Sequence, residues 1–124
     1  MTHHNVAFAS HQRLFHSDLT VQEHLRLVAA SYGQLRQAVD GLLDQSDLPP
    51  AERISRLSRA QRRRLSLESA LLAEPVVLML DDLTRGLTPG AARQLWQMVQ
   101  QAREKRPFTI RHGKNGRYHR LFWP

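Results

Sequence analysis

Two adjacent aspartates, Asp81 and Asp82, follow an unbroken apolar run from Val76 to Leu80. The run has the length of a strand, and its lack of polar residues is typical of a strand that is buried on both faces of a parallel sheet. Ligands of open α/β sheets bind beyond the carboxyl ends of the strands, where carboxylates can hold a hydrated cation. The pattern therefore predicts a site at the end of this strand. The alternative is a pair of acids that cap a helix or lie in a loop without binding a ligand.

A capped helix precedes this strand. The Ser58 hydroxyl can accept a hydrogen bond from a first-turn N–H, and Gln61, three residues later, can reach back, which is a capping box. Leucines follow at positions 65, 67, 71 and 72. Pro75 cannot continue a helix, so we expect the helix to end before it.

The segments before this helix predict one strand and two further helices. Val6 to Ala9 can enter a core as a short strand. Thr20 and Glu23 form a second capping box for a helix that Gly33 ends. The next helix runs from about Gln34 to Gln45, and its apolar face contains Leu35, Val39, Leu42 and Leu43.

The segments after the acidic pair predict a long helix and a short strand. Thr88 can cap a helix that starts at Pro89 and runs to about Arg106, with Trp96 in its core-facing stripe. Pro107 to Ile110 can begin a strand, which we expect to stop where the polar, turn-rich segment 111–117 begins.

Composition limits the class of protein. A chain of 124 residues is enough for one small domain. The absence of cysteine excludes disulfides and thiolate metal sites, and no apolar run reaches the length of about 20 residues that a membrane span needs. The net charge of +7 is concentrated in arginine-rich blocks at 53–64 and 103–120. Such blocks are typical either of contacts with polyphosphate or nucleic acid, or of solvated helix surfaces with a basic tail.

Three motifs together resemble one family. Leu57-Ser58-Arg59-Ala60-Gln61 resembles the LSGGQ signature of ATP-binding-cassette (ABC) ATPases, Val76 to Asp81 resembles their Walker B strand, and Thr84 to Pro89 resembles their D-loop region. Their order and spacing match together over about Val6 to Ile110. The resemblance implies an α/β fold, namely a partial P-loop NTPase (ABC cassette) fold that is mostly helical with a small parallel sheet.

The resemblance also implies roles for individual residues. Asp81 would hold Mg²⁺, and Asp82 stands where the catalytic glutamate orients and deprotonates the attacking water. Gln12 matches the Q-loop glutamine, which contacts the metal and that water; His11 is a competing alignment, and an ordinary exposed glutamine is the alternative to both. The residues that would contact ATP bound by the opposite subunit are Ser58, Arg59 and Gln61.

The motifs also depart from the family pattern. Arg59 and Ala60 replace the signature glycines, whose lack of a side chain lets backbone approach the phosphate. Asp82 is one methylene shorter than glutamate, and a displacement of roughly an ångström can lower a rate about 100-fold. His112 comes too early for the family's H-loop histidine. The Walker A loop, G-x-x-x-x-G-K-[ST], which cradles phosphates, does not occur in the sequence.

Taken together, these features predict the second half of a cassette, within residues 1–110, followed by a tail at 111–124 that does not resemble the family. The expected function is that of an ATP-binding subunit that is cytoplasmic, docked on a membrane permease and paired with a second cassette, with no hydrolysis by the isolated chain. Two alternatives are a basic helical module that binds nucleic acid or the ribosome, and an inactive truncated gene product.

Overall fold

The computed structural model describes residues 6–11, 15–16 and 18–113. Helices make up most of the described elements, and the strands are short. In chain order the elements are β1 (Val6–Ser10), α1 (Val21–Ser31), α2 (Arg36–Gln45), the 3-10 helix η1 (Ile54–Arg56), α3 (Arg59–Leu71), β2 (Val77–Asp81), α4 (Pro89–Lys105) and β3 (Thr109–His112).

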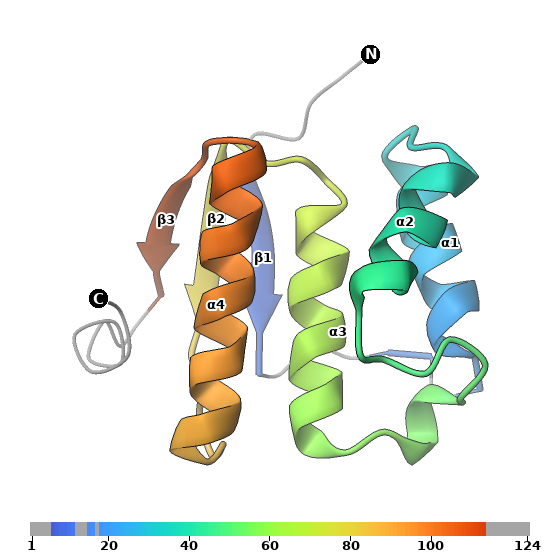
Figure 1. Cartoon of the computed structure of the whole chain (residues 1–124), viewed down its shortest axis with the longest axis horizontal. Coiled ribbons are helices and arrows are strands. Elements are labelled where there is room, and N and C mark those ends of the chain that lie inside the picture. Colours follow the sequence, from blue (N-terminus) through green and yellow to red (C-terminus); the bar gives the residue numbers. More distant parts are fainter. Residues whose placement is uncertain (1–5, 12–14, 17, 114–124) are drawn as a thin grey trace.

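The strands form one parallel sheet in the order β1-β2-β3. Figure 1 shows α4 in front of this sheet and α3 between the sheet and the pair formed by α1 and α2. The strands β1 and β2 end on the side of the molecule where α3 and α4 begin (Figure 1). This architecture confirms the predicted fold class, and the short strands β1 and β3 are the two neighbours of β2.

Local signals for the helix starts are confirmed. Thr20 and Ser58 both form complete capping boxes, and the Thr88 hydroxyl accepts from the backbone N–H of Ala91 with Pro89 in the first turn. The prediction for α2 was wrong at Leu35, which precedes the helix in extended backbone and is 71% exposed. Because α2 begins at Arg36, about two residues later than predicted, Leu35 lies before the helix and does not share the buried position of Val39.

The central strand β2 is buried on one face only, so the prediction of burial on both faces was wrong. Leu78 and Leu80 are buried, whereas Val77 and Met79 are half-buried. Successive residues of a strand point to opposite faces, so α3 and α4 cover the Leu78 face, and no helix among the described residues covers the Met79 face, which we call the open face. Val76 lies before the strand and is 56% exposed.

The prediction that the last strand stops at Ile110 was also wrong. Arg111 and His112 continue β3 and lie beside Met79 and Leu80 of β2. Backbone hydrogen bonds hold a parallel ladder together, and the open face of the sheet lets a charged side chain such as Arg111 point toward solvent.

Helix α3 is shared between two hydrophobic cores. Leu67 and Ala70 pack with the sheet and α4, while Leu65 and Leu72 pack with α1 and α2. Trp96 lies in the first core and is 3% exposed, as predicted from its helical spacing. The helix that begins with the signature residues is therefore fixed on two sides.

Candidate functional site

The acidic pair lies at the carboxyl end of the central strand. Asp81 is the last residue of β2, and the loop from Asp82 to Thr88 leads into α4. This loop is tied to the first turns of α3: the Arg59 guanidinium donates to the Gly86 carbonyl at 3.4 Å, and that of Arg63 donates to the Leu83 carbonyl at 3.0 Å. The fold thus brings the acidic pair and the start of the signature helix to one region of the molecule.

Asp82 is held in an unusual conformation. Its φ of +49° lies in the left-handed region, which a side-chain-bearing residue adopts at a cost of about 1–3 kcal/mol. Its side chain is 8% exposed; one carboxylate oxygen, Oδ2, lies 3.8 Å from the Arg85 guanidinium. The other, Oδ1, is buried and has no hydrogen-bond partner within the described ranges. Backbone strain and an unused acceptor on the same residue are typical of a binding or catalytic position.

Asp81 is bordered by His11 and Gly113. The Asp81 carbonyl accepts from the backbone N–H of His11 at 3.3 Å, and a ring nitrogen of His11, Nδ1, lies 3.2 Å from the same oxygen. A Cβ at Gly113 would lie 3.1 Å from Asp81 Oδ1, so this glycine leaves room for the carboxylate. Gln12, the predicted Q-loop residue, lies outside the described residues.

The donor set fits Mg²⁺ in part. Magnesium usually takes one or two protein carboxylates and fills its other positions with water and substrate phosphates. Asp81 and Asp82 supply that chemistry, and Asp82 Oδ1 is an acceptor without a partner among the described residues. The part of the chain that the structure describes contains no group of three or more His, Cys, Asp or Glu side chains that could hold a metal without such outside ligands.

The signature residues form an exposed helix start. Ser58 Oγ accepts from the Gln61 backbone N–H at 3.1 Å, and Gln61 Oε1 accepts from the Ser58 N–H at 2.8 Å. Arg59 is exposed and extends toward Gly86, whose φ is +76°. The structure therefore brings Ser58, Arg59 and Gln61 together in one turn, with the Arg59 side chain occupying space that glycine would leave open.

A basic pocket of about 260 Å³ lies between the first turns of α3 and the end of β1. Its lining contains no acidic residue among those described and consists of Ser10, His11, Phe15, Arg59, Arg62 and Arg63. Arg63 is 8% exposed, and burial lowers its pKa, with a smaller contribution from the nearby charge of Arg59. Its guanidinium also donates to the Arg85 carbonyl at 2.6 Å.

The sequence showed Arg63 only as one cation in a basic block, because a tertiary bond to distant carbonyls leaves no local signal. Other arginines of this block also make bonds within the chain: Arg53 to the Asp18 carbonyl, Arg62 to the Ser55 carbonyl and Arg64 to Glu68. These contacts give the block a structural role and do not favour a nucleic-acid interface.

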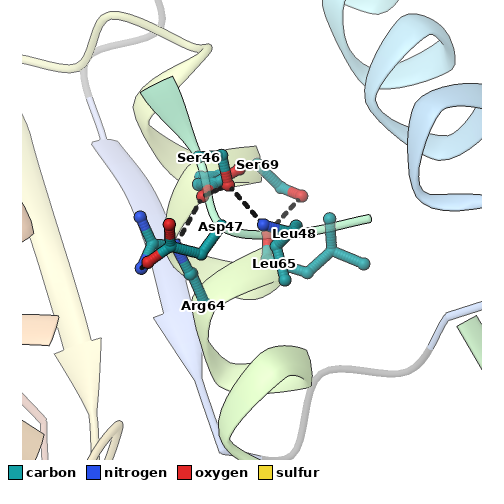
Figure 2. A network of polar contacts seen from close by, with 7 residues as sticks. Ser46, Asp47, Leu48, Arg64, Leu65 and Ser69 are labelled. Atoms are coloured by element: carbon teal, nitrogen blue, oxygen red, sulfur yellow. Dashed lines mark hydrogen bonds and ion pairs between the residues drawn. The ribbon is translucent and has the colours of Figure 1, made fainter. Parts of the chain in front are cut away.

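A buried carboxylate lies on the opposite side of α3. Glu68 is 1% exposed, and its Oε2 accepts from Ser46 at 2.7 Å and from Arg64 at 3.0 Å. Arg64 also lies 3.5 Å from Asp47, so the contacts tie the end of α2 to α3 (Figure 2). Burial raises the pKa of Glu68, although the bonds from Ser46 and Arg64 act in the opposite direction.

This raised pKa predicts a pH-dependent stability. The stability that Glu68 contributes is fully present below its ordinary pKa of 4.5 and is lost as the pH rises through the folded-state pKa. In Glu68→Gln this dependence is absent, so the free energy of unfolding of the variant should rise relative to wild type as the pH increases from about 4 to 8. Urea unfolding across that range measures the difference. The control is Glu104→Gln on exposed helix surface; a Glu68→Gln difference that does not change with pH would contradict the prediction.

The parallel sheet, the acidic pair at the end of its central strand and the capped helix beside it define a partial P-loop NTPase fold of the ABC cassette type. The sequence matches the ABC transporter family over residues 1–85. This chain belongs to that family, which confirms the resemblance drawn from the three motifs.

Individual relatives agree with this assignment. The chain is 35% identical over 94 residues to mouse ATP-binding cassette sub-family A member 9. This match covers 71% of this chain and 6% of the mouse protein. It is 36% identical over 88 residues to the Nod factor export ATP-binding protein I of Paraburkholderia xenovorans (strain LB400), covering 66% of this chain and 29% of that protein.

Solved structures show the same fold. The structure of cbiO1 from Clostridium perfringens, part of the ABC transporter complex cbiONQ, superposes with a TM-score of 0.72 at 20% identity, covering 87% of this chain and 46% of that one. A putative ABC transporter ATP-binding protein of Pyrococcus furiosus also gives a TM-score of 0.72, at 19% identity, over 90% of this chain and 57% of that one. This chain therefore corresponds to about half of a solved cassette.

None of the helices in the described part of the chain is both long and apolar enough to cross a membrane.

Proposed function

We propose that this chain is the signature and Walker B half of an ATP-binding subunit of an ABC-type transporter. The carrying observation is the acidic pair at the end of β2, tied through Arg59 and Arg63 to the start of the signature helix. On this proposal the complete subunit is cytoplasmic, lies against a membrane permease and couples ATP binding and hydrolysis to transport. The Nod factor export and cbiONQ relatives, which belong to transport systems by name, support that assignment.

The residues of the site would act in different ways. Asp81 would hold Mg²⁺ directly or through water, and ATP bound with Mg²⁺ would supply the phosphoryl group for transfer to water. Asp82 would orient that water and accept its proton. The exposed start of α3 at Ser58 presents the backbone of its first turn and the positive end of the helix dipole, which would favour phosphate charge from an opposite subunit.

The Q-loop position has two candidates. Gln12 remains the prediction from the motif, and its structure is outside the described residues. The contact of His11 with the Asp81 carbonyl supports His11 as the competing residue, because it places an imidazole directly beside the acidic pair. Substituting each residue in turn by alanine, in a chimera of this chain that hydrolyses ATP, and measuring ATP turnover would separate the two.

The isolated chain should not hydrolyse ATP, because the sequence contains no Walker A loop to bind the phosphates. A chimera that places the Walker A half of the Paraburkholderia relative before this chain should release phosphate from MgATP. Asp81→Asn should reduce that release to background, whereas Asp44→Asn, a change on the exposed surface of α2, should not. Phosphate release is measured under saturating MgATP, and circular dichroism shows that each variant is folded.

Two results would contradict the proposal. Turnover by the isolated chain that disappears in Asp81→Asn would show that no second half is needed. A folded, ATP-binding chimera whose turnover is unaffected by Asp81→Asn would show that the acidic pair has no role in hydrolysis.

The substitution of glutamate by aspartate gives a second test in the same chimera. Asp82→Glu should raise turnover by up to about 100-fold, because the longer side chain moves the carboxylate roughly an ångström toward the attacking water. Turnover that stays unchanged or falls would show that Asp82 is not the limiting departure from the family pattern.

A further inference from the structure

A pocket of about 190 Å³ lies between the end of α2, α3 and the second half of α4. In the view of Figure 1, α3 lies between α4 and α2. The lining is apolar at Leu42, Leu71 and Met98, and its polar groups include Glu68 and Lys105. None of the described lining residues belongs to the acidic pair, to the signature residues 57–61 or to the loop at 82–88. The α2–α3–α4 pocket is therefore separate from the site of the proposed function.

The carboxylate of Glu68 brings an unused acceptor to this pocket. Glu68 is 1% exposed, and its Oε2 accepts from Ser46 and Arg64. Its other oxygen, Oε1, is buried and has no hydrogen-bond partner among the described residues. Buried polar atoms of native proteins are nearly always hydrogen-bonded, so this oxygen calls for a donor from elsewhere. A ligand in the pocket that Glu68 lines can supply that donor.

The charges around Glu68 favour a donor that is a cation. Arg64 lies 3.0 Å from Glu68 Oε2 and 3.5 Å from Asp47 Oδ2. One guanidinium thus faces two carboxylates, and the cluster carries a single negative charge when both acids are ionised. An ammonium group that donates to Glu68 Oε1 would pair the unused oxygen and also balance this charge.

A charge of the opposite sign lines the same pocket. Lys105 is exposed, and its Nζ donates to Gln45 Oε1 at 3.1 Å. It makes no ion pair with any residue that the structure describes. A lysine ammonium group has three donors, so Lys105 can also bind a carboxylate. The pocket thus offers an acceptor for an ammonium group, a donor for a carboxylate and an apolar wall.

We propose that the α2–α3–α4 pocket binds a free α-amino acid with an aliphatic side chain. Its ammonium group donates to Glu68 Oε1, its carboxylate pairs with Lys105, and its side chain lies against Leu71 and Met98. A cavity of about 150 Å³ can hold a benzene molecule, so this pocket has room for a small amino acid. Binding needs no nucleotide, and the bound molecule would connect α2, α3 and α4 of one subunit.

Titration calorimetry of the full 124-residue chain with L-leucine tests this inference. One molecule of L-leucine should bind per chain. Isocaproate is leucine without its amino group, and isoamylamine is leucine without its carboxylate. Each of these two analogues should bind at least about tenfold more weakly, because each loses one charge-assisted hydrogen bond.

Substitutions locate the binding site. Lys105→Met should weaken the binding of L-leucine about tenfold. Arg93→Met is the matched control, because Arg93 is also an exposed cation on α4 but does not line the pocket. Glu68→Gln should weaken binding at least as much as Lys105→Met, since an amide cannot balance an ammonium charge. Circular dichroism shows whether this variant is folded; if it is not, Lys105→Met and the two analogues decide.

Each outcome decides the inference. Binding of L-leucine that weakens in Lys105→Met but not in Arg93→Met, with weaker binding of both analogues, supports it. Absence of binding at millimolar L-leucine, equal effects of the two substitutions, or a folded Glu68→Gln chain with unchanged affinity overturns it. An analogue that binds as tightly as L-leucine also overturns it, because the pocket would then recognise only one end of the molecule.

Discussion

Leu78→Ala is expected to lower the free energy of unfolding by about 2–5 kcal/mol. Leu78 is fully buried in the centre of β2, where it packs in the core formed by the sheet, α3 and α4. Truncation removes apolar contacts and leaves a cavity between elements that cannot close around it. Urea unfolding followed by circular dichroism measures the loss.

The adjacent residue provides the control. Met79 lies next to Leu78 in the chain but on the open face, so Met79→Ala should cost about 1 kcal/mol or less in the isolated chain. Equal losses at the two positions would show that both faces of β2 are covered in solution.

Arg63→Met is expected to lower the free energy of unfolding by about 2–4 kcal/mol. Its guanidinium donates to the Leu83 and Arg85 carbonyls, and methionine fills similar volume but leaves both acceptors without this donor. The loop that follows the acidic pair should loosen at the same time, which amide hydrogen exchange at 83–86 would show as lost protection.

Arg62→Met is the matched control for this prediction. Arg62 is exposed and makes one bond to the Ser55 carbonyl, so its loss should change stability by at most about 0.5 kcal/mol. If Arg63→Met is equally mild, the buried guanidinium does not hold the loop.

The parts of the fold that the sequence predicted well depend on local signals. Thr20, Ser58 and Thr88 precede helices because their hydroxyls satisfy first-turn N–H groups, a contact within three residues of sequence. The position of Asp81 followed from an apolar run of strand length and from the rule that sites lie at strand carboxyl ends. These inferences needed no knowledge of distant residues.

The parts that failed depend on tertiary context. The apolar run of β2 indicated two buried faces, but among the described elements the helices that cover the sheet, α3 and α4, lie on one face, so Val77 and Met79 remain half-buried. Arg111 was expected to end the last strand, yet pairing with β2 extends it. The buried positions of Arg63 and Glu68 had no signal either, because charged residues on a helix normally face solvent and their partners lie far along the chain.

The candidate site shows the same division. Its residues could be listed from motif order, but the left-handed backbone of Asp82 and the contact between His11 and Asp81 follow from how the loop is held by α3 and β1. The roles assigned to these residues remain predictions that the chimera tests.

The order of strands in the sheet has a consequence for folding. β1 pairs with β2 across the whole α1–α2–α3 segment, whereas β2 and β3 are separated only by the loop at 82–88, by α4 and by a short turn. Each doubling of a closed loop adds about 0.6 kcal/mol of entropic cost, so pairing of β1 closes the costlier loop. We therefore expect the parallel β2–α4–β3 unit to form early and β1 to join late. The strand that carries Phe8 and leads to His11 would then also be the first to detach during partial unfolding.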